Sequence, residues 1–90
     1  MDSHIVFLGL GANLGDREAN LKAAVDEINK RVGEVTSLSA FYVTKPWGFD
    51  SPHAFLNAVC CIETTLSPHE ILWVTQDIER MVGRTKKTVN

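Results

Sequence analysis

The sequence predicts an α+β fold in which an antiparallel sheet carries both of its helices on one face. Two observations favour this class: two amphipathic helical patterns, and three strand-like stretches arranged with them in the order strand–helix–strand–strand–helix. The 90 residues are 44% hydrophobic and 22% charged, which is ordinary for a globular domain. We therefore predict a single domain that spans residues 1–90.

The first strand and the first helix are predicted by an apolar run followed by a change to helical spacing. Residues His4–Leu10 contain a continuous apolar stretch, which is typical of a central strand buried on both faces. Asp16 is a suitable N-cap for the helix, and Gly33 is predicted to end it. The apolar positions of this helix are Leu21, Ala24, Val25, Ile28 and Val32. Charged pairs four residues apart are Asp26 with Lys30 and Glu27 with Arg31.

The second and third strands lie on either side of an aromatic-rich loop. Residues Glu34–Val43 are rich in β-branched and aromatic side chains, and Phe55–Thr64 alternates between two faces. The face of the third strand predicted to meet the helices carries Leu56, Ala58, Cys60 and Ile62. The face predicted to carry a binding slot holds Phe55, Asn57, Val59, Cys61 and Glu63.

The second helix begins with a capping box. Ser67 is followed by Pro68 at the first helical position and by Glu70 three residues after the cap. Its buried stripe is predicted to be Ile71, Val74, Thr75, Ile78 and Val82, and Leu72, Gln76 and Glu79 form a separate row. Gly83 is predicted to end the helix before a basic tail. The order β-α-β-β-α matches a ferredoxin-like β-α-β-β-α-β fold, with the last strand expected to be missing from this chain.

Composition excludes several classes of protein. The formal net charge of −2 argues against a nucleic-acid binder, and no apolar run is long enough to cross a bilayer. Without a signal-like N-terminus, the expected location is the cytoplasm. The adjacent Cys60 and Cys61 are predicted to be small buried hydrophobic residues and not a redox pair. The three histidines are widely separated and predict no metal site.

The aromatic loop and the strand after it predict a slot for a flat ring. Trp47 and Phe55 could stack on the faces of a ring, or could pin the loop as a small apolar cluster. Asn57 interrupts an apolar strand, and its amide matches the mixed donor–acceptor edge of a heterocycle. An Asn satisfied by backbone groups is an equally good explanation of that residue taken alone. Thr44 together with these residues favours the slot.

The glycine-rich turn after the first strand does not fit a dinucleotide-binding fingerprint. Its third glycine, Gly15, falls one position late, and no acidic residue ends the second strand. Gly11 and Asn13 either border a ligand or simply make a tight strand-to-helix turn.

A set of short motifs extends over nearly the whole chain in a fixed order. The motifs are Gly9–Asp16, Tyr42–Gly48, Phe55–Val59, Leu66–Pro68, Ile78–Glu79 and Gly83–Arg84. Together they resemble the 6-hydroxymethyl-7,8-dihydropterin pyrophosphokinases of folate biosynthesis, and the chain resembles the N-terminal part of such a domain. The resemblance implies transfer of pyrophosphate from ATP to the hydroxymethyl group of the dihydropterin, with release of AMP. It also implies a monomer whose partners are these two small molecules, without nucleic acid or membrane.

The resemblance implies two sets of binding residues. The pterin set is Gly11, Asn13, Thr44, Lys45, Pro46, Trp47, Phe55 and Asn57. The nucleotide set is Leu72, Gln76, Glu79 and Arg84. Lys45 stands where the family often has a second proline, and Phe55 stands where it commonly has tyrosine. The first change is expected to loosen the loop, and the second removes a hydroxyl group but keeps the ring.

The implied catalytic machinery is expected outside this chain. In the family an Asp-x-Asp motif on the next strand holds two Mg²⁺ ions, and no Asp-x-Asp occurs in these 90 residues. We therefore expect no catalytic residue and no metal ligand before Asn90, an inactive 90-residue chain, and an Mg²⁺- and ATP-dependent intact enzyme. The alternative is a non-enzymatic ferredoxin-like module that binds a small molecule. An RNA-binding module is disfavoured because Val59 and Cys61 stand where stacking aromatics are needed.

Overall fold

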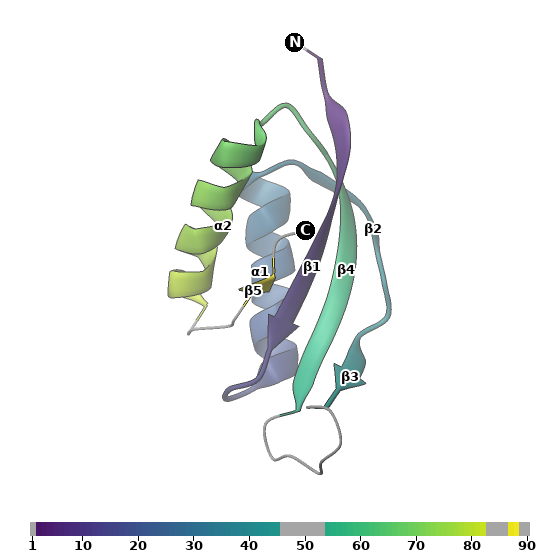
Figure 1. The fold of residues 1–90 in the computed structure, drawn as a ribbon, viewed down its shortest axis with the longest axis vertical. Coiled ribbons are helices and arrows are strands. Elements are labelled where there is room, and N and C mark those ends of the chain that lie inside the picture. Colours follow the sequence, from purple (N-terminus) through teal and green to yellow (C-terminus); the bar gives the residue numbers. More distant parts are fainter. Residues whose placement is uncertain (1, 46–53, 83–86, 89–90) are drawn as a thin grey trace.

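The computed structural model describes residues 2–45, 54–82 and 87–88 and shows two helices packed on one face of a twisted sheet (Figure 1). In chain order, the elements are β1 (His4–Ala12), α1 (Arg17–Arg31), β2 (Glu34–Leu38), β3 (Tyr42–Thr44), β4 (Phe55–Thr64), α2 (Pro68–Met81) and β5 (Lys87–Thr88). This arrangement confirms the predicted α+β class with both helices on the same side.

All the strand pairs are antiparallel, and the sheet order is β2-β4-β1-β5. This is the order of a ferredoxin-like sheet, in which the last strand lies beside the first. In the position of that last strand the structure describes only a two-residue strand, β5, in which Lys87 and Thr88 pair with Leu10 and Gly9 of β1. The predicted ferredoxin-like class is confirmed as a partial fold. Too little apolar alternation follows α2 for this short pairing to be predicted from the sequence.

The predicted second strand is divided into two. β2 and β3 both pair with the same edge of β4, but the ladder shifts register between Val35 and Ser37. At Ser39, the backbone N–H donates to Val59 O at 2.9 Å, and the side-chain hydroxyl accepts from Val59 N at 2.8 Å. A serine side chain thus replaces a backbone carbonyl in the ladder, so the chain leaves regular strand geometry before β3 begins.

The core lies between the helices and one face of the sheet. In β4, Ala58, Cys60 and Ile62 are fully buried, as the predicted alternation requires. The main cluster of buried side chains is Leu8, Ala24, Ile28, Val32, Cys60, Ile62, Ile71 and Ile78. Burial raises the pKa of the Cys60 thiol, consistent with its role as a small apolar residue. Cys61 is only half-buried, because it points to the opposite face.

That opposite face of the sheet is open within the described residues. Phe7 of β1 is 62% exposed and Ile5 is 55% exposed, and Val59 of β4 lies on the same side. The predicted slot belongs to this open face, at the end where β1 finishes and β4 starts.

Both helix starts follow the predicted capping chemistry. The Asp16 side chain accepts from Ala19 N at the start of α1. In α2, Glu70 N donates to Ser67 Oγ at 3.2 Å and Ser67 N donates to Glu70 Oε1 at 2.8 Å, which completes the capping box. The hydrogen bonds between Ser67 and the Glu70 carboxylate, chiefly the one from the Ser67 backbone N–H, lower the pKa of Glu70.

Gly33 follows α1 as predicted, but for a different reason than a left-handed cap. Among the described glycines only Gly15 has a positive φ, of 60°. Gly33 instead passes so close to β4 that a side chain there would collide with the Glu63 backbone. The position therefore requires glycine for its size.

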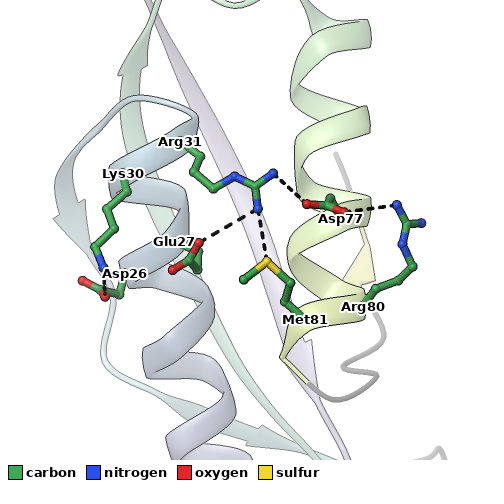
Figure 2. A network of polar contacts seen from close by, with 7 residues as sticks. All are labelled: Asp26, Glu27, Lys30, Arg31, Asp77, Arg80 and Met81. Carbon is green, nitrogen blue, oxygen red and sulfur yellow. Dashed lines mark hydrogen bonds and ion pairs between the residues drawn. The ribbon is translucent and has the colours of Figure 1, made fainter.

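One arginine joins the two helices (Figure 2). The predicted pairs within α1 are present, with Lys30 3.1 Å from Asp26 and Arg31 3.9 Å from Glu27. The shorter contact of Arg31 is to Asp77 of α2, at 2.7 Å. This contact lowers the pKa of Asp77. The contact between helices was not predictable from spacing within one helix.

Candidate functional site

The candidate ring slot lies where three neighbouring strands meet at one end of the open face. Asn57 of β4 is paired with Gly11 of β1 on one side and with Tyr42 of β3 on the other. One step along, Thr44 is paired with Phe55 at the start of β4. Residues that are separated by as many as 46 positions in the sequence are thereby brought to one place, because antiparallel pairing fixes the register.

The Asn57 amide is oriented by β3. Its Nδ2 donates to Thr44 Oγ1 at 2.7 Å and lies 3.4 Å from two backbone oxygens, those of Tyr42 and Phe55. The amide nitrogen is therefore satisfied by the protein, as in one of the two explanations left open by the sequence. Its Oδ1 accepts no hydrogen bond from the described residues, so this oxygen is the atom available to a ligand N–H.

Asn13 contributes a second unpaired oxygen. It lies one residue beyond the end of β1, and its Oδ1 is buried without a hydrogen-bond partner among the described residues. Buried polar atoms of this kind are rare and are usually paired by a ligand or an ordered water. A side-chain oxygen held out of solvent at the end of β1 is suited to accept from a bound heterocycle.

The turn that carries Asn13 is held in place from both sides. Gly15 adopts the left-handed conformation that turns the chain into α1, and Asn20 donates from Nδ2 to the Leu14 carbonyl oxygen at 3.1 Å. Arg17, at the start of α1, donates from Nη1 to the Ala54 carbonyl oxygen at 2.6 Å. Ala54 is the residue immediately before β4, so the turn and the start of β4 are tied together.

Arg17 was not among the predicted site residues. The available signal was a cation at the first position of a helix, where the partial positive charge of the helix terminus disfavours it. Such a residue needs a partner outside the helix, and the Ala54 carbonyl oxygen supplies one.

The remaining pterin-set residues lie at the edge of the described structure. Lys45 is exposed directly after β3, and Phe55 is half-buried as the first residue of β4. Pro46 and Trp47 lie outside the described residues, as does Arg84 of the nucleotide set. The structure thus brings together Gly11, Asn13, Thr44, Phe55 and Asn57. It does not describe Pro46, Trp47 or Arg84.

The predicted nucleotide residues lie on α2. Leu72 and Glu79 are half-buried and Gln76 is exposed, whereas Ile71 and Ile78 face the core. Figure 1 shows that α2 ends toward the same end of the molecule as β1. The three side chains stand at positions i, i+4 and i+7 of α2 and therefore form one row along that helix.

The hollow between α1 and β2 is a different feature. It has a volume of about 350 Å³ and is lined by Lys22, Val25, Asp26, Asn29, Val35, Leu38 and Phe41. None of these residues belongs to either predicted set.

The described residues contain no group of three or more His, Cys, Asp or Glu side chains that could hold a metal ion. No described helix is both long enough and apolar enough to span a membrane.

Comparison with known proteins identifies relatives that match most of this sequence. Residues 7–90 match the family described as 7,8-dihydro-6-hydroxymethylpterin-pyrophosphokinase. The 2-amino-4-hydroxy-6-hydroxymethyldihydropteridine pyrophosphokinase of Porphyromonas gingivalis is 55% identical over 93% of this chain and 57% of its own length. The enzyme of the same name from Bacillus subtilis is 40% identical over 94% of this chain and 52% of its own length.

A larger protein shows the same similarity over a small part of its length. The folic acid synthesis protein fol1 of Pneumocystis carinii is 36% identical over 96% of this chain and 12% of its own length. The chain spans slightly more than half the length of the two bacterial relatives.

Proposed function

The chain belongs to the 7,8-dihydro-6-hydroxymethylpterin-pyrophosphokinase family, and from this we propose that the protein makes a pterin pyrophosphate for folate biosynthesis. In the proposed reaction, the hydroxymethyl oxygen of 6-hydroxymethyl-7,8-dihydropterin attacks the β-phosphorus of ATP. The bond from that phosphorus to the oxygen bridging the α- and β-phosphates breaks, and AMP leaves. The hydroxyl proton is lost in the same step.

The observation that carries the proposal is the oriented amide of Asn57. Its nitrogen is held by Thr44, so its oxygen is presented to the slot, and the unpaired Asn13 Oδ1 is a second acceptor nearby in the fold. A pterin carries ring and exocyclic N–H donors along its edges, which need acceptors of this type. We assign Phe55 to stacking on the ring and Gly11 to close approach of the backbone.

The rest of the pterin set completes the proposed slot. Thr44, Lys45, Pro46 and Trp47 would line it, largely through backbone groups. In this proposal the described residues bind and orient the acceptor, which is how an enzyme lowers the barrier of a reaction with little covalent chemistry of its own.

The nucleotide is proposed to lie against α2. Leu72 would contact the base, Gln76 and Glu79 would offer hydrogen-bonding groups, and Arg84 would contact phosphate. Two Mg²⁺ ions are proposed to neutralise the phosphates in the intact protein. The described residues present no carboxylate cluster for them, so we assign no metal ligand to these residues. We further propose that the protein is a cytoplasmic monomer and that residues 1–90 belong to a single domain.

Binding of each substrate tests the proposal. Isothermal titration of the 90-residue chain with 6-hydroxymethyl-7,8-dihydropterin should show one site. Asn57→Ala should weaken binding by about tenfold, since the proposed hydrogen bond from the pterin to Asn57 Oδ1 is lost. The control Glu63→Gln changes the same face of β4 at its far end and should leave the dissociation constant unchanged.

An activity assay separates the enzyme from a simple binding module. The 90-residue chain should release no AMP from ATP in the presence of the dihydropterin and Mg²⁺. The intact protein should release AMP in proportion to pterin pyrophosphate. An intact protein that binds the pterin but neither binds nor cleaves ATP would refute the proposed reaction and favour the non-enzymatic module.

A further inference from the structure

Arg17 makes a long-range contact that the proposed reaction does not use directly. It is the first residue of α1, and its part-buried Nη1 donates to the carbonyl oxygen of Ala54 at 2.6 Å, across 37 positions of sequence. A short hydrogen bond from a charged donor to a carbonyl is among the stronger kinds in proteins.

The position of this arginine is unfavourable for the helix itself. The N-terminus of a helix carries partial positive charge, which disfavours a cation in the first turn. The neighbouring acids are engaged elsewhere: Asp16 caps Ala19, and Glu18 pairs with Lys22 at 2.9 Å. Within the described residues Arg17 forms no salt bridge, so its described partner is the Ala54 carbonyl oxygen.

The Ala54 carbonyl lies immediately before β4. The ladder with β3 begins at Phe55, and Ala54 precedes it. On the other side of the hydrogen bond, Arg17 follows the turn that carries Asn13. One side chain therefore connects two segments that supply slot residues, the turn with Asn13 and the start of β4 with Phe55 and Asn57.

We propose that Arg17 is a positioning residue for the pterin slot. It holds the start of β4, which carries Phe55 and Asn57, in a fixed position relative to the β1–α1 turn, which carries Asn13. The assignment to the pterin rests on the proposed function, whereas the anchoring of β4 does not.

The binding test uses three variants of the same helix. Arg17→Ala removes the donor, and Arg17→Lys keeps a cation that can donate one hydrogen bond. Lys22→Ala removes a different cation about one turn further along α1. Isothermal titration should show that Arg17→Ala weakens pterin binding about tenfold, with ATP affinity in the intact protein changed less than twofold. Arg17→Lys should bind the pterin at least about twofold more tightly than Arg17→Ala, which is a third of the lost decade in affinity. Lys22→Ala should bind the pterin as tightly as the unsubstituted protein.

Hydrogen exchange tests the anchoring without any ligand. Mass spectrometry on the ligand-free chain should show faster amide exchange, about tenfold, in Arg17→Ala for residues 55–58, with no change for residues 60–63. Unchanged exchange at residues 55–58 would overturn the anchoring, even in a protein that binds no pterin.

The two measurements distinguish the separate failures. If the unsubstituted protein binds no pterin, the proposed function fails, and the exchange result alone decides the role of Arg17. If it binds pterin and Arg17→Ala binds equally well, the positioning role is wrong. Equal losses of pterin and ATP affinity, or no recovery in Arg17→Lys, would also overturn it, since these results indicate general destabilisation.

Discussion

The substitution Gly33→Ala should destabilise the fold because α1 returns to the sheet with no room for a methyl group. A Cβ at this position would collide with the Glu63 carbonyl oxygen, and would lie 2.7 Å from Thr64 Cβ and 3.0 Å from the Glu63 carbonyl carbon. Two of these three atoms are backbone of β4. No side-chain rotation can relieve the collision, so either β4 or the end of α1 must move.

The magnitude follows from the groups that would be displaced. Overpacking of a tightly packed site costs roughly 1–3 kcal/mol. The adjacent hydrogen bond from Thr64 Oγ1 to the Val32 carbonyl oxygen, 2.5 Å long and buried, would be disturbed at a further cost of about 1 kcal/mol. Replacing glycine returns roughly 0.4–1 kcal/mol by restricting the unfolded chain. These contributions sum to an expected net loss of about 1–3.6 kcal/mol, or roughly 4–29 °C in Tm for a domain of this size.

Urea unfolding followed by circular dichroism measures this loss, and Gly15 provides the control. Gly15 has a φ of 60°, and a Cβ there would have open space, with its nearest contact at 3.9 Å. Gly15→Ala should therefore cost only about 1 kcal/mol, and Gly15→Asn less, because asparagine tolerates the left-handed region. Gly33→Asn should be at least as harmful as Gly33→Ala. A free energy of unfolding for Gly33→Ala within 0.5 kcal/mol of the unsubstituted chain, on the order of an ordinary surface change, would refute the steric argument.

Three other outcomes are expected. Ser67→Ala should lower stability by about 1 kcal/mol through loss of the capping box, and a calorimetric Tm within 1 °C or so of the unsubstituted value would contradict this. Thr44→Val removes the acceptor that orients Asn57, so titration should show pterin affinity falling roughly 2- to 12-fold, with Thr44→Ser as the matched control that keeps it. Arg31 lowers the pKa of Asp77, so the folded state binds fewer protons and stability should fall as pH drops through the ordinary aspartate value of about 3.9 to the lower folded value. Asp77→Asn should flatten this acid limb of an unfolding-versus-pH curve, and an unchanged limb would show that the bridge between the helices does not contribute.

The sequence was sufficient for elements whose causes are local. Capping at Asp16 and Ser67 depends on residues three positions away, and the two helical stripes depend on spacing within one helix. The alternation in β4 correctly assigned Ala58, Cys60 and Ile62 to the core, because a strand with one buried face repeats every two residues. The same local patterns, taken together, were enough to place the chain in its family.

Contacts between segments far apart in the sequence could not be predicted from such local patterns. The break between β2 and β3 depends on the Ser39 hydroxyl meeting Val59, and the short strand β5 exists because β1 offers a free edge. Gly33 was assigned to the right place for the wrong reason, since the approach of β4 becomes visible only when both segments are in space.

The candidate site divides in the same way. The residue types that a ring can contact were predictable without coordinates: an amide in an apolar strand, glycine and asparagine in a turn, and aromatics in a loop. Three features required the folded chain: Thr44 orients Asn57, Asn13 Oδ1 lacks a partner among the described residues, and Arg17 donates to the Ala54 carbonyl oxygen. Hydrogen bonds and burial depend on atoms within a few ångströms, and strand pairing brings these atoms together from distant parts of the chain.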